Sequence, residues 1–170
     1  MSSGLPDDLR EANERYAAGW GDRAGLEAPP RRRLAVLTCM DARFEPLRAL
    51  GLAEGDAHVI RNAGGIATDD ALRSLVISNR LLGTTAAYVI AHTRCGMASF
   101  TNEELHAQLE AEGVDARSLD FLPFRDVEAS VVDSVRRLRE TPLLPPDYRV
   151  EGFVFEVETG RVRSVAEAAG

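Results

Sequence analysis

The sequence predicts an α/β fold in which a mainly parallel central sheet is flanked by helices, with an N-terminal helical arm and a C-terminal hairpin at the sheet edge. Short apolar runs of strand length alternate along the chain with longer segments of helical periodicity. The 170 residues are 45% hydrophobic and 28% charged, which is typical of a soluble protein with a packed core. A chain of this length buries such a core without needing disulfides.

The first element is an amphipathic helix within residues 5–20. Its apolar positions recur at helical spacing and are Leu9, Ala12, Tyr16 and Trp20. The Gly- and Pro-bearing connection 21–30 detaches this helix from the next element. We therefore expect residues 1–30 to form an arm and linker and residues 31–170 to form one α/β domain. A detached apolar stripe needs another surface, which a partner subunit could supply.

Three continuous apolar runs follow the pattern of buried strands that are covered on both faces. They are "LAVLTC" at 34–39, "AHVIRNAGG" at 57–65 and "AAYVIAH" at 86–92. The second run ends in two glycines, where the backbone must turn sharply or approach another group closely.

The intervening segments have helical patterns. Residues 68–83 begin at Thr68, a suitable N-cap, and stop at Gly83. Their predicted inner face is Leu72, Leu75, Val76 and Leu82. Residues 125–140 form another helix, with an inner stripe of Val127, Val131, Val135 and Leu138. Residues 101–113 predict a weaker, exposed helix.

The C-terminal part predicts a loop and then an edge hairpin. Prolines in "TPLLPPDY" exclude a helix or a central strand there. From residue 149 onward a strand, a tight turn at Thr159-Gly160 and a short strand follow.

The charge balance argues against two classes of partner. A formal net charge of -7 and a pI near 5.0 disfavour a general surface for nucleic acid or an anionic membrane. The N-terminus lacks the pattern of a secretory signal, and no stretch approaches the ~20 apolar residues that cross a bilayer. We expect a cytoplasmic location.

Chemically capable residues follow the predicted strands. In an open parallel sheet the reactive site lies beyond the carboxyl ends of the strands, where Cys39, the corner 61–63 and His92 fall. His92 and Cys95 can bind one metal ion from a single turn, and Cys39 would complete a Cys2His set with a fourth position left for water. Spacing alone leaves open a core histidine and two inert thiols.

Three blocks carry a resemblance to a known family. "CMDAR" from Cys39, "HVIRNAGG" from His58 and "HTRCGM" from His92, in this order, resemble the β-class carbonic anhydrases, especially the short bacterial and archaeal members. The similarity runs from about Leu34 to the closing strands. It implies zinc held by Cys39, His92 and Cys95, and reversible zinc-dependent hydration of carbon dioxide to bicarbonate and a proton. It also implies a homodimer or higher homo-oligomer, with the N-terminal helix reaching over its neighbour.

The resemblance makes Asp41 and Arg43 the catalytic Asp/Arg dyad. Asp41 would accept a hydrogen bond from the zinc-bound nucleophile, and Arg43 would keep Asp41 ionised and turned away from the metal. If Arg43 lets go, Asp41 would bind zinc itself and close the site at lower pH, so activity should rise with pH.

Small residues beside the site suit a small substrate. The backbone of Asn62, Ala63, Gly64, Gly65 and Gly96 can approach a triatomic molecule closely and hold bicarbonate oxygens. No nucleotide-binding glycine motif is present. Some family members contact substrate through a Gln, but the only Gln here is Gln108, outside the motifs. His58 and His106 receive no role.

The sequence is compatible with two alternative functions. Relatives of the fold can hydrolyse carbon disulfide or carbonyl sulfide, and no residue here excludes that activity. The chain could instead be a non-enzymatic, zinc-stabilised sensing or interaction domain in which Asp41 fills the fourth position. Arg43 argues against this second alternative, because a structural site needs no group to pull the carboxylate away.

Overall fold

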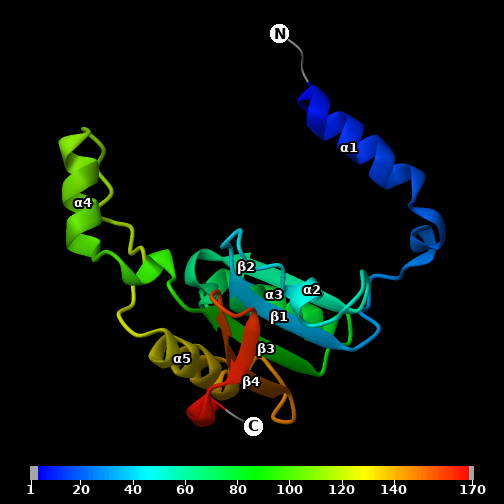
Figure 1. Ribbon diagram of the computed structural model, residues 1–170. Helices are drawn as coiled ribbons and strands as arrows, with labels where there is room; N and C mark the ends of the chain where they lie inside the picture. The colour runs from blue at the N-terminus through cyan, green and yellow to red at the C-terminus, as the bar shows by residue number, and fades with distance from the viewer. Residues whose placement is uncertain (1–3, 169–170) are drawn as a thin grey trace.

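The computed structural model describes residues 4–168, which adopt the predicted α/β fold (Figure 1). The described residues form a five-stranded sheet with the order β2-β1-β3-β4-β5. The strands are β1 (Leu34–Cys39), β2 (Ala57–Asn62), β3 (Ala86–His92), β4 (Arg149–Glu156) and β5 (Arg161–Ser164). The first four are parallel, and β5 pairs antiparallel with β4, which confirms the predicted edge hairpin. Residues 1–3 of the predicted arm and 169–170 of the predicted domain lie outside the described residues.

The helices fall where the periodicity places them, with shifted ends. They are α1 (Asp7–Ala18), α2 (Pro46–Ala49), α3 (Asp69–Arg80), α4 (Asn102–Ala111) and α5 (Val127–Glu140). The Thr68 side chain accepts a hydrogen bond from the Ala71 N–H, which confirms it as the N-cap of α3. That helix ends at Arg80, before Gly83, and α5 begins two residues later than predicted because Asp126 caps it. The four-residue α2 was not predicted.

The main core lies between one face of the sheet and helices α3 and α5. Leu75, Val131 and Val135 are fully buried there against strand residues. The opposite face carries a smaller cluster, in which Phe44 stacks on Phe155 with ring centroids 4.2 Å apart. Tyr88 and Phe153 on that face are only half-buried. The second face of the sheet is therefore less completely covered by other parts of the described chain than the first.

Strand β2 differs from its prediction as a strand covered on both faces. It lies at the edge of the sheet described here, and its residues are half-buried except Arg61, which is more accessible as a whole residue although its side chain is only 28% exposed. The apolar run alone does not distinguish an edge strand from a central one. The strand also ends at Asn62, because residues Ala63–Gly65 form the short 3-10 turn η2.

Helix α1 stands away from the sheet, as Figure 1 shows in blue. None of its residues is buried against the rest of the described chain. Leu9 on the helix is 52% exposed, and Leu5, just before it, is 57% exposed. Tyr16 and Arg23 both hydrogen-bond to Glu54, which ties the base of the arm to the body. Among the described residues, no helix has the length and apolar character needed to span a membrane.

Candidate metal centre

The three predicted ligands converge at the carboxyl end of the sheet. Strands β1 and β3 are parallel neighbours in register, so Cys39 and His92 emerge at the same edge, and Cys95 follows in the turn after β3. One donor atom from each residue lies within 4.8 Å of the other two, and all three residues are buried. The two sulfurs are 4.0 Å apart. Two thiols and an imidazole form a donor set that suits zinc.

The His92 ring is oriented for a metal. Its Nδ1 donates to the Thr93 carbonyl at 2.9 Å, which leaves the Nε2 lone pair directed into the cluster. Nε2 is buried and has no hydrogen-bond partner among the described residues. A buried polar atom without a partner costs free energy, and coordination of a cation there removes that cost. The donor set therefore fits a metal better than a hydrogen-bonded core histidine.

The two thiol groups lie within hydrogen-bonding distance of each other. A hydrogen bond from Cys95 lowers the pKa of Cys39 below its usual value, against the opposing effect of burial, and the His92 side chain and the backbone N–H groups of Asp41 and Gly64 assist. The same contact raises the pKa of Cys95 above its usual value. Cys39 is thus primed as a thiolate, and a bound dication would stabilise both sulfurs as anions.

Asp41 is held beside the cluster by Arg43. The guanidinium donates from Nε to Oδ1 at 2.9 Å and from Nη2 to Oδ2 at 2.7 Å, and the Arg43 backbone N–H also reaches Oδ1. These bonds hold the pKa of Asp41 far below its usual range, so the carboxylate is ionised. Oδ2 lies 3.6 Å from His92 Nε2. This arrangement is the one expected when Arg43 keeps the carboxylate away from the metal.

The turn between His92 and Cys95 is braced by the C-terminal hairpin. Thr93 Oγ1 donates to Glu158 at 2.7 Å and accepts from the Val157 N–H at 3.0 Å. Arg94 has a positive φ of 53°, and its carbonyl accepts a further bond from Arg43 Nη2 at 3.1 Å. None of these three contacts was predicted, because each joins segments far apart in the sequence.

Three of the predicted substrate-pocket residues, Asn62, Gly65 and Gly96, have different surroundings in the structure. The Asn62 amide is committed to its own loop, accepting from the Ile66 N–H and donating to the Ile66 carbonyl, so its side chain is not free for a ligand. Gly65 has φ 68°, and a Cβ there would lie 2.9 Å from the Cys39 nitrogen, which explains the glycine by close packing on the ligand strand. A Cβ on Gly96 would meet nothing within 4 Å, which leaves space beside Cys95.

The remaining histidines are satisfied away from the cluster. His58 hydrogen-bonds to Ser78 Oγ at 2.8 Å and the Ala28 carbonyl at 3.1 Å, and His106 bonds to the Leu119 carbonyl at 2.8 Å. These contacts agree with assigning neither residue a chemical role.

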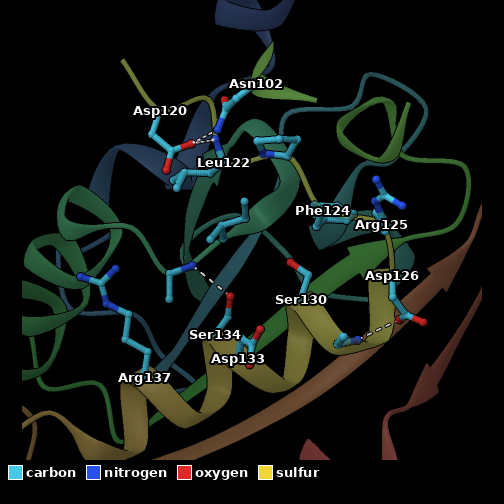
Figure 2. Close-up of a pocket in the computed structure, with 14 residues that line it drawn as sticks. Asn102, Asp120, Leu122, Phe124, Arg125, Asp126, Ser130, Asp133, Ser134 and Arg137 are labelled. Atoms are coloured by element: carbon cyan, nitrogen blue, oxygen red, sulfur yellow. Dashed lines mark hydrogen bonds between the residues drawn. The ribbon is translucent and has the colours of Figure 1, made fainter. Parts of the chain in front are cut away.

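A cavity of ≈ 640 Å³ lies elsewhere, along α5 (Figure 2). It contains none of the three ligands, and its polar groups are largely paired within the chain. Asp120 accepts from Asn102, Ser134 accepts from the Ala67 N–H, and Asp126 caps the first turn of α5. The cavity therefore does not compete with the ligand cluster as the reactive site.

Sequence comparison identifies relatives along nearly the whole chain. The family model described as carbonic anhydrase matches residues 34–162. The curated β-carbonic anhydrase 1 of Mycobacterium tuberculosis is 40% identical over 161 residues, covering 95% of this chain and 98% of that protein. A carbon disulfide hydrolase of Acidianus sp. is 37% identical over 159 residues, covering 79% of this chain and 78% of that protein.

Structural comparison agrees. A carbonic anhydrase of Streptococcus mutans superposes with a TM-score of 0.91 at 47% identity, covering 97% of this chain and 99% of that chain. The fold, the family match and the curated relatives lead to one conclusion: this chain belongs to the β-carbonic anhydrase family.

Proposed function

We propose that this protein is a zinc lyase that reversibly hydrates carbon dioxide to bicarbonate and a proton. The observation that carries the proposal is the convergence of Cys39, His92 and Cys95 around a buried, unpartnered imidazole nitrogen, with an ionised carboxylate alongside. Family membership and the carbonic anhydrases among its relatives support the same activity.

Each residue has a separate role in this proposal. Cys39, His92 and Cys95 would hold the zinc, which when bound acidifies water and supplies a nucleophile at neutral pH. Asp41 would accept a hydrogen bond from that nucleophile, without taking its proton, and so orient it toward the substrate carbon. Arg43 keeps Asp41 ionised and in place through two side-chain hydrogen bonds. The space beside Gly96 would admit the substrate.

The test is stopped-flow hydration of carbon dioxide from about pH 6 to about pH 9, together with metal analysis of protein purified without chelators. We expect about one zinc per chain and a rate that rises with pH. Asp41→Ala should retain zinc and lose activity by about 100-fold. A rate that is flat across this range, or an Asp41→Ala variant as active as its parent, would contradict the proposal.

Hydrolysis of carbon disulfide is the second candidate, favoured by the relative at 37% identity that carries that name. Carbonyl sulfide is a further possible substrate of this hydrolysis, because carbon dioxide, carbon disulfide and carbonyl sulfide are all linear triatomic molecules. A sulfide-release assay on the same preparation separates these activities. Sulfide release without detectable carbon dioxide hydration would replace the lyase assignment with a hydrolase.

A homo-oligomer, dimeric or larger, is proposed from the arm. Helix α1 buries none of its side chains against the described chain. Leu9 and Tyr16 on the helix, and Leu5 just before it, are exposed. We infer that residues 1–30 act as an arm that docks on a second copy, while residues 31–170 form the catalytic domain. Cys39 and Cys95 must stay reduced to bind metal, which fits a cytoplasmic location.

A further inference from the structure

We propose that Arg61 is a positioning residue for the reaction, because its guanidinium holds the loop that carries both a metal ligand and the catalytic carboxylate. This inference rests on the proposed function. In the sequence, Arg61 is marked only by its interruption of a strand run, which does not by itself indicate a role.

The guanidinium of Arg61 donates hydrogen bonds to three backbone carbonyls. Its Nε donates to the Cys39 carbonyl at 2.9 Å, and its Nη2 donates to the carbonyls of Asp41 and Phe44 at 2.7 Å and 2.9 Å. Its Nη1 lies 3.8 Å from the Glu45 carboxylate. One side chain therefore fixes the path of the chain from the end of β1 to the start of α2.

The strand register places Arg61 where it can make these bonds. In the parallel β1–β2 pair, Arg61 is opposite Thr38 and Asn62 is opposite Cys39. The side chain is 28% exposed, so much of it lies against the loop. Segment 40–45 has no strand partner of its own, apart from the bond between the Met40 N–H and the Asn62 carbonyl. Without Arg61, the carbonyls of Cys39 and Asp41 would lose these described donors.

Two arginines therefore position Asp41 in different ways. Arg43 holds the carboxylate through its oxygens, while Arg61 holds the backbone from which that carboxylate projects. A rigid fork with several donors is needed to reach three carbonyls at once, and a lysine ammonium on a flexible stem cannot reproduce it. Small errors in the placement of a catalytic group reduce the rate strongly.

The experiment compares Arg61→Lys and Arg61→Met with Arg80→Lys. Arg80 also donates two bonds to a backbone carbonyl, that of Leu143, and is remote from the ligand cluster, which makes it a matched control. The measurements are zinc transfer to a chromogenic chelator, the visible absorption of the cobalt-substituted protein, kcat and KM for hydration, and thermal unfolding.

We expect both Arg61 variants to release zinc about ten-fold faster, to shift the cobalt bands and to lose kcat about ten-fold with little change in KM. Arg80→Lys should match the parent in all of these. Unchanged zinc release and cobalt spectra in Arg61→Lys would overturn the inference, even if its unfolding temperature falls. If the parent binds zinc but hydrates no carbon dioxide, the proposed function fails, and zinc release and the cobalt spectra still decide the role of Arg61.

Discussion

At the scale of single residues, the site depends on how each ligand is held as much as on which ligands are present. The His92 ring is fixed through one nitrogen, so the other is available to bind the zinc that we propose. Asp41 is kept ionised by the guanidinium of Arg43, which also bonds to the carbonyl of Arg94. Backbone atoms of Thr38 and Cys39 in strand β1 pack directly on Gly65.

Gly65→Ala is predicted to be more destabilising than Gly83→Ala. Both glycines have positive φ, but only at Gly65 would a Cβ meet backbone, 2.9 Å from the Cys39 nitrogen, while at Gly83 it would meet nothing within 4 Å. Placing alanine at the positive φ of Gly83 should lower the free energy of unfolding by about 1 kcal/mol. At Gly65 the additional collision with backbone should at least double this loss. Urea denaturation of both variants measures the difference. Equal losses would show that η2 can shift away from the ligand strand.

The ligands could be predicted from the sequence because they stand at the ends of strongly apolar strands, and parallel topology brings such ends together. Arg61 and Glu158 could not. Arg61 acts on carbonyls about 20 positions earlier, and Glu158 reaches Thr93 from a hairpin 65 positions later. These contacts depend on register and turn geometry, which residue types alone do not specify. Arg61 does interrupt an apolar strand, and this was the one signal available.

At the scale of elements, the β4–β5 hairpin braces the turn between the proposed ligands His92 and Cys95. Thr93→Val removes the hydroxyl that donates to Glu158 and accepts from the Val157 N–H, whereas Thr93→Ser retains it. We expect Thr93→Val to release zinc several-fold faster, since each lost bond is worth about 1 kcal/mol. Zinc transfer to a chelator measures this effect.

Thr159→Val is the control for that experiment. Thr159 donates to Glu156 within the same hairpin and makes no described contact with the turn between His92 and Cys95. Its zinc release should equal that of the parent. If Thr93→Val and Thr159→Val behave alike, the hairpin does not brace the metal site.

The ionised carboxylate of Asp56 accepts a hydrogen bond from Arg31, just before β1, so the stability of the fold should depend on pH. The Ala53 N–H and then Arg31 lower the pKa of Asp56 below its usual value. A pKa lowered in the folded state means that the contribution to stability is present above the unfolded value of about 4 and is lost as pH falls through the folded value. Asp56→Asn should therefore be less stable than its parent at pH 7.

Denaturant unfolding of Asp56→Asn and the parent from about pH 7 to about pH 2.5 tests this dependence. The difference in unfolding free energy should be largest at neutral pH and approach zero at the acid end. A difference that stays constant across the range would mean that the Asp56 charge does not contribute.

Two predictions about elements were wrong or incomplete for physical reasons. The run at 57–62 was predicted to be covered on both faces, yet β2 lies at the edge of the described sheet, and its polar residues His58, Arg61 and Asn62 are the composition that distinguishes it from β1 and β3. Helix α2 has four residues and begins at Pro46, too short for any periodicity to reveal it.

At the scale of the whole molecule, the arm is the feature that a single chain does not explain. Helix α1 projects from the body in Figure 1 and has no buried residue in the described chain. The half-buried Tyr88 and Phe153 lie on the thinly covered face of the sheet. Both features are expected of a protein that completes its packing with a second copy.

Deletion of residues 1–20 should produce monomers or insoluble protein, because it removes the exposed apolar stripe of α1. Sedimentation velocity measures the oligomeric state. A milder variant, Leu5→Glu with Leu9→Glu, should weaken association, while Glu11→Gln should not. A truncated chain that is monomeric, stable and fully active would contradict the role of the arm.

The most direct test of the account is zinc-edge X-ray absorption on protein purified without chelators. We predict one zinc environment with two sulfur neighbours at about 2.3 Å and one imidazole nitrogen at about 2.0 Å, with one sulfur lost in Cys95→Ser. Absence of zinc, or a zinc ion surrounded only by nitrogen and oxygen, would contradict the claim that Cys39, His92 and Cys95 bind a single metal ion.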